Sequence, residues 1–336
     1  MGLEILGCTV DPVLVAAYIV VSVVILWLVR KWSDGGWCYS KARLDGKTII
    51  ITGANTGIGK ETARDFAKRG ARVILACRDL AKAEAAVTEI YKETGSNNLV
   101  VRKLDLASLA SIRAFAEKIK AEETRLDILV NNAGIMMCPE WKTEDGFEMQ
   151  FGVNHLGHFL LTNLLLDLIK SSSPSRIVNV ASLAHIWGKM HWDDLMMRSG
   201  YDALLSYGQS KLANILFSKE LSKRLAGSGV SVYSLHPGSV STELTRYFNH
   251  GLKFPLRYIF SIITSAPIRM LVFKSAVQGA QTSIYCSVTE ELKEVTGMYY
   301  SDCAEVKPNR LAQDEESGRR LWEVSAELVG LEKKME

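Results

Sequence analysis

Residues 48–59 read TIIITGANTGIG, a β-branched apolar run that ends in a glycine-rich loop. A short continuous apolar run of this kind is typical of a strand that is buried on both faces of a parallel sheet. Gly53, Gly57 and Gly59 allow a tight turn and a close approach of the backbone to a diphosphate, and a helix N-terminus after the loop would offer free N–H groups. The spacing GxxxGxG differs from the general GxGxxG fingerprint, so a turn with a purely structural role is the alternative.

Strand and helix patterns alternate along the rest of the chain. We expect helices at 60–69, 79–94, 108–123, about 147–170 and about 203–226, and strands at 72–76, 99–104, 127–130, 176–181 and 230–235. Such alternation gives a parallel sheet with helices on both faces, because right-handed crossovers leave no other simple packing. The sequence therefore predicts the α/β class, with a doubly wound, Rossmann-like parallel sheet in a single catalytic domain.

The composition is that of a globular protein: of 336 residues, 48% are hydrophobic and 23% are charged. The net charge of +3 is small and its basic residues are mixed with acidic ones, so we expect no nucleic-acid partner. The six cysteines are far apart and include no CxxC pair, which favours reduced thiols. His155 and His158 have no third ligand nearby, so we expect no metal.

Residues 12–29 are uncharged and nearly all apolar, which is about the minimum length for a helix that crosses a bilayer. Glu4 and Asp11 precede this run and Trp32 follows it, whereas a cleavable signal peptide would have basic residues before it and a small-residue cleavage site after it. We therefore expect an uncleaved anchor. A buried core helix and a half-inserted anchor are the alternatives.

The chain then divides into an anchor at 1–31, a linker at 32–46, a catalytic domain at 47–300 and a C-terminal extension at 301–336. The positive-inside rule places the catalytic domain on the cytosolic side. The basic residues behind this orientation are Arg30, Lys31, Lys41 and Arg43.

The end of the second expected strand indicates which dinucleotide the chain binds. An NAD enzyme presents Asp or Glu about 20 residues after the glycines, but Ala76 and Cys77 stand here. Arg78 follows them, and its guanidinium can pair with a 2′-phosphate. This favours NADP(H), although an Arg78 that is solvated or paired with Asp79 is the alternative.

Tyr207 and Lys211 are four residues apart, a spacing that places both side chains on one face of a helix. A nearby ammonium is expected to lower the pKa of the phenol and make it a usable proton donor. Ser182 and Asn132 each follow an expected strand, and ligands of open α/β sheets bind at the carboxyl ends of strands. These residues are therefore expected to meet in one crevice.

Several motifs together resemble the short-chain dehydrogenase/reductase family. They are TGANTGIG at 52–59, NNAG at 131–134, Asn154 in VNHLGHF, Ser182, the Tyr207/Lys211 pair and HPG at 236–238. ACRD at 76–79 and SKLANILF at 210–217 further resemble the microsomal retinol dehydrogenases.

The resemblance implies roles for four residues. Tyr207 would be the general acid in reduction, and Lys211 would hold it and the nicotinamide ribose. Ser182 would orient the substrate carbonyl together with Tyr207, and Asn154 would keep a water that links Lys211 to solvent. Hydrogen bonds from Tyr207 and Ser182 suit the oxyanion charge that builds up on a reduced carbonyl.

The cofactor contacts that follow from the loop and the resemblance extend over several strand ends. They are Gly53, Asn55, Thr56, Gly57, Ile58, Gly59, Arg78, Asp105, Leu106, Asn132, Ala133, Gly134, Tyr207, Lys211, Pro237, Gly238, Val240 and Thr242. The chain departs from its relatives at Ala181, where they usually have serine, and His155 and His158 are expected to be helix-packing residues.

Between 252 and 277, apolar residues alternate with lysines and arginines, which suits a substrate-covering lid that lies in the headgroup layer of a membrane. An ordinary pair of surface helices is the alternative. The resulting hypothesis is an NADPH-dependent retinaldehyde reductase, reversible as a retinol dehydrogenase, on the endoplasmic reticulum membrane. Lipid-derived aldehydes or steroids as substrates, a catalytically silent scaffold and a mitochondrial membrane are the alternatives, and the sequence leaves the oligomeric state open.

Overall fold

A single eight-stranded sheet organises the computed structural model, which describes residues 3–5, 8–247 and 273–331. Its strand order is β10-β9-β8-β7-β6-β3-β4-β5, and all neighbours are parallel except β9 and β10. The strands are β3 (Thr48–Thr52), β4 (Arg72–Cys77), β5 (Leu99–Lys103), β6 (Ile128–Asn131), β7 (Ser175–Val180), β8 (Val230–His236), β9 (Tyr299–Ser301) and β10 (Ala304–Glu305). The six strands expected from the sequence are all present, with bounds that differ by no more than one residue.

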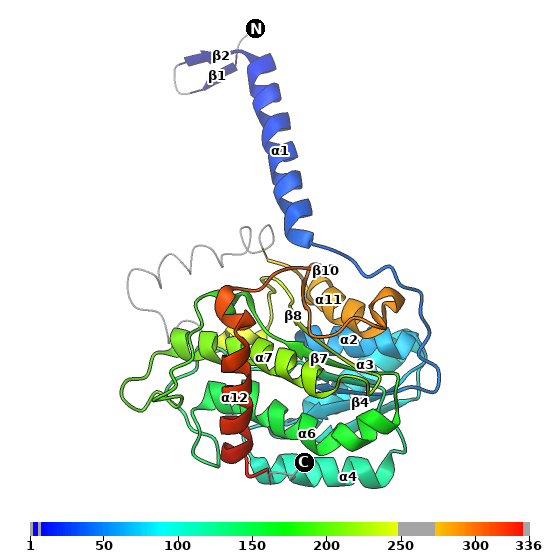
Figure 1. Ribbon diagram of the computed structural model, residues 1–336. Helices are drawn as coiled ribbons and strands as arrows, with labels where there is room; N and C mark the ends of the chain where they lie inside the picture. The colour runs from blue at the N-terminus through cyan, green and yellow to red at the C-terminus, as the bar shows by residue number, and fades with distance from the viewer. Residues whose placement is uncertain (1–2, 6–7, 248–272, 332–336) are drawn as a thin grey trace.

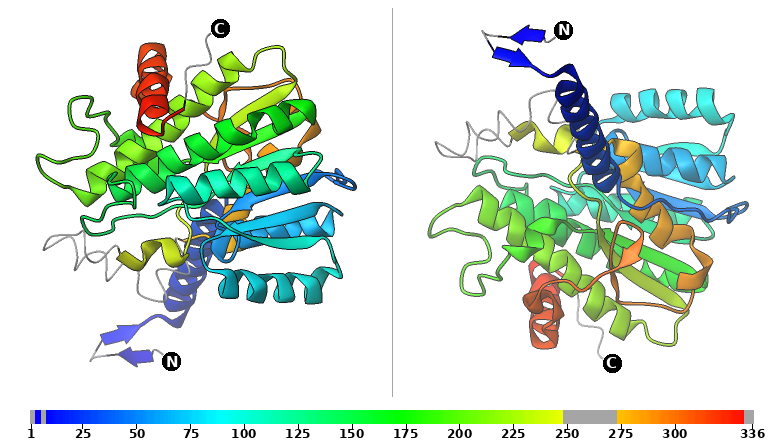
Figure 2. Two further views of the ribbon diagram at one scale, coloured as in Figure 1. Left: turned by 90° about the horizontal axis from the view of Figure 1, so that it is seen from below. Right: turned by 90° about the horizontal axis from the view of Figure 1, so that it is seen from above.

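Helices cover both faces of this sheet, as Figure 2 shows. On one face lie α4 (Leu109–Glu122), α6 (Gly157–Ser171) and α7 (Ala203–Arg224); on the other lie α2 (Gly57–Lys68), α3 (Leu80–Thr94) and α11 (Ala276–Val288). Strand β3 is buried throughout, with Ile50 in the first core and Ile49 and Ile51 in the second. The doubly wound parallel fold is therefore confirmed, and the apolar run of β3 is explained by burial on both faces.

The helix expected at about 147–170 is found in three pieces. A short α5 (Met149–Phe151) leads into a π-helical turn, Gly152–Leu156, and only then does α6 begin. The sequence pattern did not indicate this interruption. Extra turns of this type inside helices are frequent at functional sites, and here the turn carries Asn154.

The chain beyond residue 273 also contributes to the body of the structure. Helix α12 (Glu315–Leu328) packs against α7, as Figure 1 shows, and Leu321 joins the core on that side of the sheet. Short 3-10 turns lie at Leu183–Ile186, Glu243–Tyr247, Glu290–Leu292 and Arg310–Gln313. Cys38, Cys77, Cys138, Cys286 and Cys303 are free thiols.

Helix α1 (Pro12–Asp34) projects from the rest of the protein. A small hairpin of β1 (Leu3–Ile5) and β2 (Cys8–Val10) lies at its outer end (Figure 1). Its stretch Val13–Lys31 is long and apolar enough to cross a membrane, and none of its most apolar window is buried. A core helix would be buried, so this exposure disfavours that alternative.

The base of α1 is fastened to the catalytic body. Arg30 donates from Nη1 to the carbonyl of Phe273 at 2.9 Å and from Nη2 to Oε1 of Gln278 at 3.0 Å. Asp34 forms an ion pair with Arg30 at 2.8 Å. Gln278 lies in the first turn of α11, so these bonds connect the helix to the segment that follows the expected lid. Most of that lid, residues 252–272, lies outside the described residues.

Candidate functional site

The glycine-rich loop after β3 has a backbone conformation that residues with a Cβ atom would not readily adopt. Gly53 and Gly57 have φ angles of 65° and 56°, in the left-handed region that favours glycine. A Cβ on Gly59 would lie 2.5 Å from both the Gly53 carbonyl oxygen and Nδ2 of Asn132. Thr56 precedes α2 and makes no side-chain cap, so the first N–H groups of that helix stay available to an anion. The loop therefore fits a diphosphate group.

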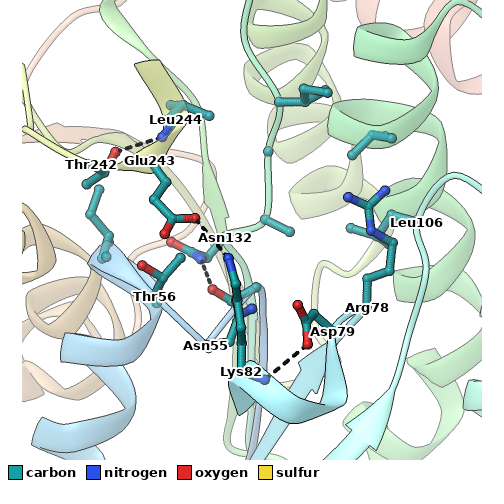
Figure 3. A pocket seen from close by; sticks show the side chains of 18 of the residues that line it. Asn55, Thr56, Arg78, Asp79, Lys82, Leu106, Asn132, Thr242, Glu243 and Leu244 are labelled. Carbon is teal, nitrogen blue, oxygen red and sulfur yellow. Dashed lines mark hydrogen bonds and ion pairs between the residues drawn. The ribbon is translucent and has the colours of Figure 1, made fainter. Parts of the chain in front are cut away.

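A cleft runs from this loop across the carboxyl ends of β3, β4 and β6 (Figure 3). It brings together most of the residues expected at the cofactor: Gly53, Asn55, Thr56, Gly57, Ile58, Gly59, Arg78, Asp105, Leu106, Asn132, Ala133, Gly134 and Thr242. The other expected cofactor contacts, Tyr207, Lys211, Pro237, Gly238 and Val240, are not among its lining. A Cβ on Gly238 would lie 2.8 Å from the Lys274 side chain, and Val240 instead packs against Gly279 of α11.

Other lining residues were missed by the motif-based prediction. They are Ala76, Asp79, Lys82, Leu104, Ile135, Met149, Val153, Glu243, Leu244 and Arg246. Lys82 lies in the first turn of α3, just after the capping residue Asp79, and a basic residue at a helix start beside the expected phosphate site was the signal that was available for it. No motif pointed to 243–246, whose contribution depends on how the chain returns after β8.

The basic side chains at the adenosine end of the cleft differ in their partners. Among the described residues, the Arg78 guanidinium has no hydrogen bond or ion pair, and in Figure 3 its side chain extends away from the Asp79 carboxylate. Asp79 instead caps α3 by accepting a bond from the Lys82 N–H at 3.0 Å. Lys82 lies 3.8 Å from Glu243 across the cleft, while Lys60 pairs with Glu89 and does not line it.

The expected catalytic residues come from three elements at the same edge of the sheet. Tyr207 and Lys211 lie on α7, Ser182 follows β7, and Asn154 lies in the π-helical turn. Lys211 donates from Nζ to the Val180 carbonyl at 3.1 Å, and Nζ lies 5.7 Å from the centroid of the Tyr207 ring. The Ser182 hydroxyl accepts from the Ala184 N–H at 3.2 Å, and Ser182 is near enough to the Tyr207 phenol to lower the pKa of that phenol.

Asn154 holds the loop that lines the cleft floor. Its Oδ1 accepts from the Ile135 N–H at 2.8 Å, and its Nδ2 donates to the Ile135 carbonyl at 2.9 Å and to the Ser210 hydroxyl at 2.9 Å. A Cβ on Gly134 would lie 3.3 Å from Oδ1 of Asn154 and 3.5 Å from Nζ of Lys211. Asn154 and Lys211 thus lie next to Gly134, which lines the cleft, while none of the four expected catalytic residues is itself part of the cleft lining.

Burial governs the proton affinities of the central pair. Burial raises the pKa of Tyr207 to about 12, against the lowering effect of the nearby Ser182, and it lowers the pKa of Lys211 to about 8. The expectation that the ammonium lowers the phenol pKa is therefore corrected. Lys211 faces the ring of Tyr207, and burial of the phenol is the dominant effect on its pKa, with Ser182 as the group that lowers it.

The turn that carries Ser182 is held by the C-terminal part of the chain. The Ser182 carbonyl accepts from Nδ1 of His185 at 2.8 Å, and the His185 carbonyl accepts from Nδ2 of Asn309 at 2.8 Å. Ala181, the departure noted in the sequence, is almost fully buried, so a serine hydroxyl is not needed there.

Comparison with known proteins finds a matching family model and relatives that are similar over most of the chain. The family model for the short chain dehydrogenases matches residues 47–253. Human "Retinol dehydrogenase 13" is 56% identical over 307 residues, 91% of each chain, and mouse "Retinol dehydrogenase 12" is 51% identical over 90% of this chain and 93% of its own.

Solved structures share the fold. A crystal structure from Mycobacterium paratuberculosis has a TM-score of 0.70 at 35% identity and covers 88% of this chain and 98% of its own. A gluconate 5-dehydrogenase-type structure from Beutenbergia cavernae with bound NADP has a TM-score of 0.61 at 25% identity, over 77% of this chain and 96% of its own.

Proposed function

Because this chain belongs to the short-chain dehydrogenase family, we propose that it is an NADPH-dependent retinaldehyde reductase that also runs in reverse as a retinol dehydrogenase. Membership of the family makes the chain an oxidoreductase with a nicotinamide cofactor. The substrate, the choice of NADPH and the residue roles are the proposal.

The choice of NADPH is supported by charge at the end of β4. A 2′-phosphate needs a cation and is repelled by an acid, and the chain has Ala76 and Cys77 where an NAD enzyme has its acid. Arg78 and Lys82 both line the cleft there, and the Arg78 guanidinium has no charged partner among the described residues. A related fold with bound NADP is consistent with this preference.

The observation that carries the reductase assignment is the buried Tyr207 side chain, whose phenol lies near Ser182 and whose ring faces the ammonium of Lys211. With its pKa raised to about 12, Tyr207 keeps its proton at neutral pH and can donate it to a carbonyl oxygen. Ser182 orients that oxygen and stabilises the charge that develops on it. The bound cofactor supplies the hydride.

Lys211 and Asn154 keep this arrangement in place. Lys211 is fixed by the Val180 carbonyl and lies close to Gly134, where its ammonium can bond the ribose of a bound cofactor. Asn154 binds Ile135 through both ends of its amide and keeps the wall of the cleft at a fixed distance from α7. Both are roles in binding and orientation.

A lipophilic substrate is supported by the inner lining of the cleft and by the relatives. Ile135, Met149, Val153 and Leu244 line it with apolar side chains, and Leu244 lies close to Gly134. The relatives with more than half of their residues identical are named retinol dehydrogenases. With α1 as an anchor, we place the catalytic domain on the cytosolic side of the endoplasmic reticulum membrane, with a mitochondrial membrane as the alternative.

The test is steady-state kinetics of the full-length protein in detergent with all-trans-retinal and either NADPH or NADH. We expect turnover of retinal with a clear preference for NADPH. A parallel panel of lipid-derived aldehydes and steroid ketones checks the competing substrates. Higher kcat/KM for either of those classes would replace the retinoid assignment, and no turnover of any carbonyl would favour a cofactor-binding scaffold.

A further inference from the structure

A buried histidine links the cofactor loop to the turn that carries Asn154. His158, in the first turn of α6, is 3% exposed. Its Nε2 lies 2.9 Å from Oγ1 of Thr52, at the end of β3, and its Nδ1 lies 3.1 Å from the carbonyl oxygen of Asn154. The two partners are 102 residues apart in sequence, so the imidazole is a cross-link between separate elements.

The hydrogen bonds of Thr52 determine which nitrogen of His158 carries the proton. The Thr52 hydroxyl accepts from the Asn132 N–H and from the Ala133 N–H, each at 2.9 Å. A hydroxyl has two acceptor positions and one proton, so its proton is left for the 2.9 Å contact with His158, in preference to the Val130 carbonyl at 3.5 Å. Nε2 is therefore the acceptor, and Nδ1–H donates to the Asn154 carbonyl.

The surroundings of His158 keep the ring neutral. It is fully buried, and Lys211 and His155 are the titratable groups near it in the described part of the chain, where no acid favours a second proton. Burial, with the charge of Lys211, lowers the pKa of His158 to about 4. A second proton on Nε2 would also point at a hydroxyl whose two acceptor positions are already occupied. The cross-link is thus maintained over the whole neutral range.

The bonds continue from Asn154 to the catalytic helix. Nδ2 of Asn154 donates to the Ser210 hydroxyl at 2.9 Å, and that hydroxyl donates to the Tyr207 carbonyl at 2.8 Å. A series of hydrogen bonds therefore joins the cofactor loop to the proton donor; it runs through Thr52, His158, Asn154, Ser210 and Tyr207.

We propose that His158 is a positioning residue for this enzyme: it fixes the Asn154 turn on one side and the Thr52 hydroxyl on the other. Through Thr52 it fixes residues 132–133, which line the cofactor cleft. Through Asn154 it sets the position of α7. The effect on turnover rests on the proposed function, whereas the tautomer and the effect on cofactor binding do not.

His155 is a matched control in the same segment. It is also fully buried, but its Nε2 bonds the Ser325 hydroxyl of α12 at 2.8 Å, and its Nδ1 has no hydrogen-bond partner among the described residues. His155 packs against Phe151, Phe159 and Phe217, away from the cleft. Replacing it removes a buried imidazole with one hydrogen bond and leaves the contacts of Thr52 and Asn154 intact.

Two substitutions separate the two contacts of His158. In His158→Asn the amide nitrogen can take the place of Nδ1 and keep the bond to the Asn154 carbonyl, while the Thr52 contact is lost. In His158→Gln the terminal amide reaches the position of Nε2 and can accept from Thr52, while the Asn154 contact is lost. His155→Gln is the control, and all variants are made in the full chain.

We expect His158→Gln to lower kcat for retinal about tenfold with KM for NADPH within about twofold of the parent, because the catalytic helix is displaced. We expect His158→Asn to raise KM and Kd for NADPH about fivefold with kcat largely kept, because the loop wall is loosened. His155→Gln should change neither kinetic constant by more than about twofold. If kcat and KM of both His158 variants change together in proportion to the loss in Tm, the residue is only structural and the proposal fails.

A second measurement needs neither substrate nor cofactor. The ¹⁵N shifts of the histidine ring nitrogens in the full chain should show His158 as a neutral Nδ1–H tautomer from about pH 5.5 to 9, with the His158→Gln spectrum identifying the signal. An Nε2–H tautomer, or titration within that range, would overturn the cross-link. If the wild type turns over no carbonyl, the proposed function fails, while this spectrum and the NADPH Kd still decide the role of His158.

Discussion

Lys211 lies against the face of the Tyr207 ring, with Nζ 5.7 Å from the ring centroid, while Ser182 lies near the phenol group and lowers its pKa. The two neighbours therefore act on different parts of the tyrosine. Ser182 acts on the hydroxyl group that holds the proton, whereas Lys211 lies over the ring and donates to the Val180 carbonyl. Substitutions of the tyrosine and the lysine should accordingly have different effects.

Tyr207→Phe removes only the hydroxyl group. We expect turnover of retinal to fall by about 10²- to 10⁴-fold, since that is the usual contribution of a general acid, with NADPH binding nearly unchanged. Single-turnover kinetics and a fluorescence titration with NADPH measure the two effects. Tyr233→Phe is the control, because it removes a buried hydroxyl bonded to the Leu292 carbonyl beneath α11. A Tyr207→Phe enzyme with more than half of the parent activity would contradict the assignment.

Lys211→Met should abolish most turnover and stabilise the folded protein. Burial lowers the pKa of Lys211 from 10.5 to about 8, so the charged side chain costs on the order of 3 kcal/mol in the folded state. Loss of the bond to Val180 offsets about 1 kcal/mol of this gain. We expect Tm at pH 7 to rise by about 4 °C.

The pH dependence gives the sign of this effect. Below pH 8 the lysine is charged in both states and its cost is fully present; above 10.5 it is neutral in both and the cost is gone. The Tm difference between Lys211→Met and the parent should therefore shrink as pH rises from 8 to 10.5. Lys219→Met on the same helix, whose ammonium contacts the Gln313 carbonyl near the surface, is the control. A Tm gain that is equal at pH 7 and pH 10 would contradict the explanation.

Most of the fold could be predicted because its strands are continuous apolar runs that end at glycine or at polar residues. β3 is the clearest case, since Ile49, Ile50 and Ile51 are all fully buried. β9 was missed because it has three residues, Tyr299–Ser301, too few to show a period. Helix α12 was missed although Asp314 caps it and acidic residues fill its first turn, which are signals that a search for helix starts would find.

The π-helical turn could not be predicted from local sequence. Residues 147–170 have a helical pattern throughout, and the interruption at Gly152–Leu156 depends on contacts with distant residues. Ile135 binds both ends of the Asn154 amide, and His158 binds its carbonyl. The same is true of the cleft, where the glycine loop and Arg78 follow from motifs but Glu243 and Leu244 depend on the chain path after β8.

Deletion of residues 1–31 should release the protein from membranes at least in part. α1 is the only described helix with the length and hydropathy of a membrane span, and its apolar surface is exposed. Its contacts with the body are the polar ones made by Arg30 and Asp34, so the catalytic domain should stay folded. Membrane flotation and alkaline carbonate washing measure the outcome, with NADPH binding as the folding control. If carbonate strips the full-length protein completely, the anchor assignment is wrong.

Arg78→Ala and Arg78→Glu should shift cofactor preference from NADPH towards NADH. The Arg78 guanidinium lines the cleft without a charged partner among the described residues. It can therefore bind a phosphate without first breaking an ion pair. Because the side chain is exposed, its loss should cost NADPH only about 1.5 kcal/mol, or about tenfold in kcat/KM. NADH has no 2′-phosphate and should lose little.

Glutamate should act more strongly than alanine, because it repels the phosphate and offers the ribose hydroxyls the acceptor that NAD enzymes place at this strand end. The measurement is the ratio of kcat/KM for NADPH to that for NADH in each variant. Lys60→Ala is the matched control, since Lys60 pairs with Glu89 and does not line the cleft. An unchanged ratio in both Arg78 variants would transfer the role to Lys82, which faces Glu243 across the same cleft. Lys82→Ala would then be expected to produce the shift, because removing that ammonium leaves Glu243 unopposed beside the phosphate.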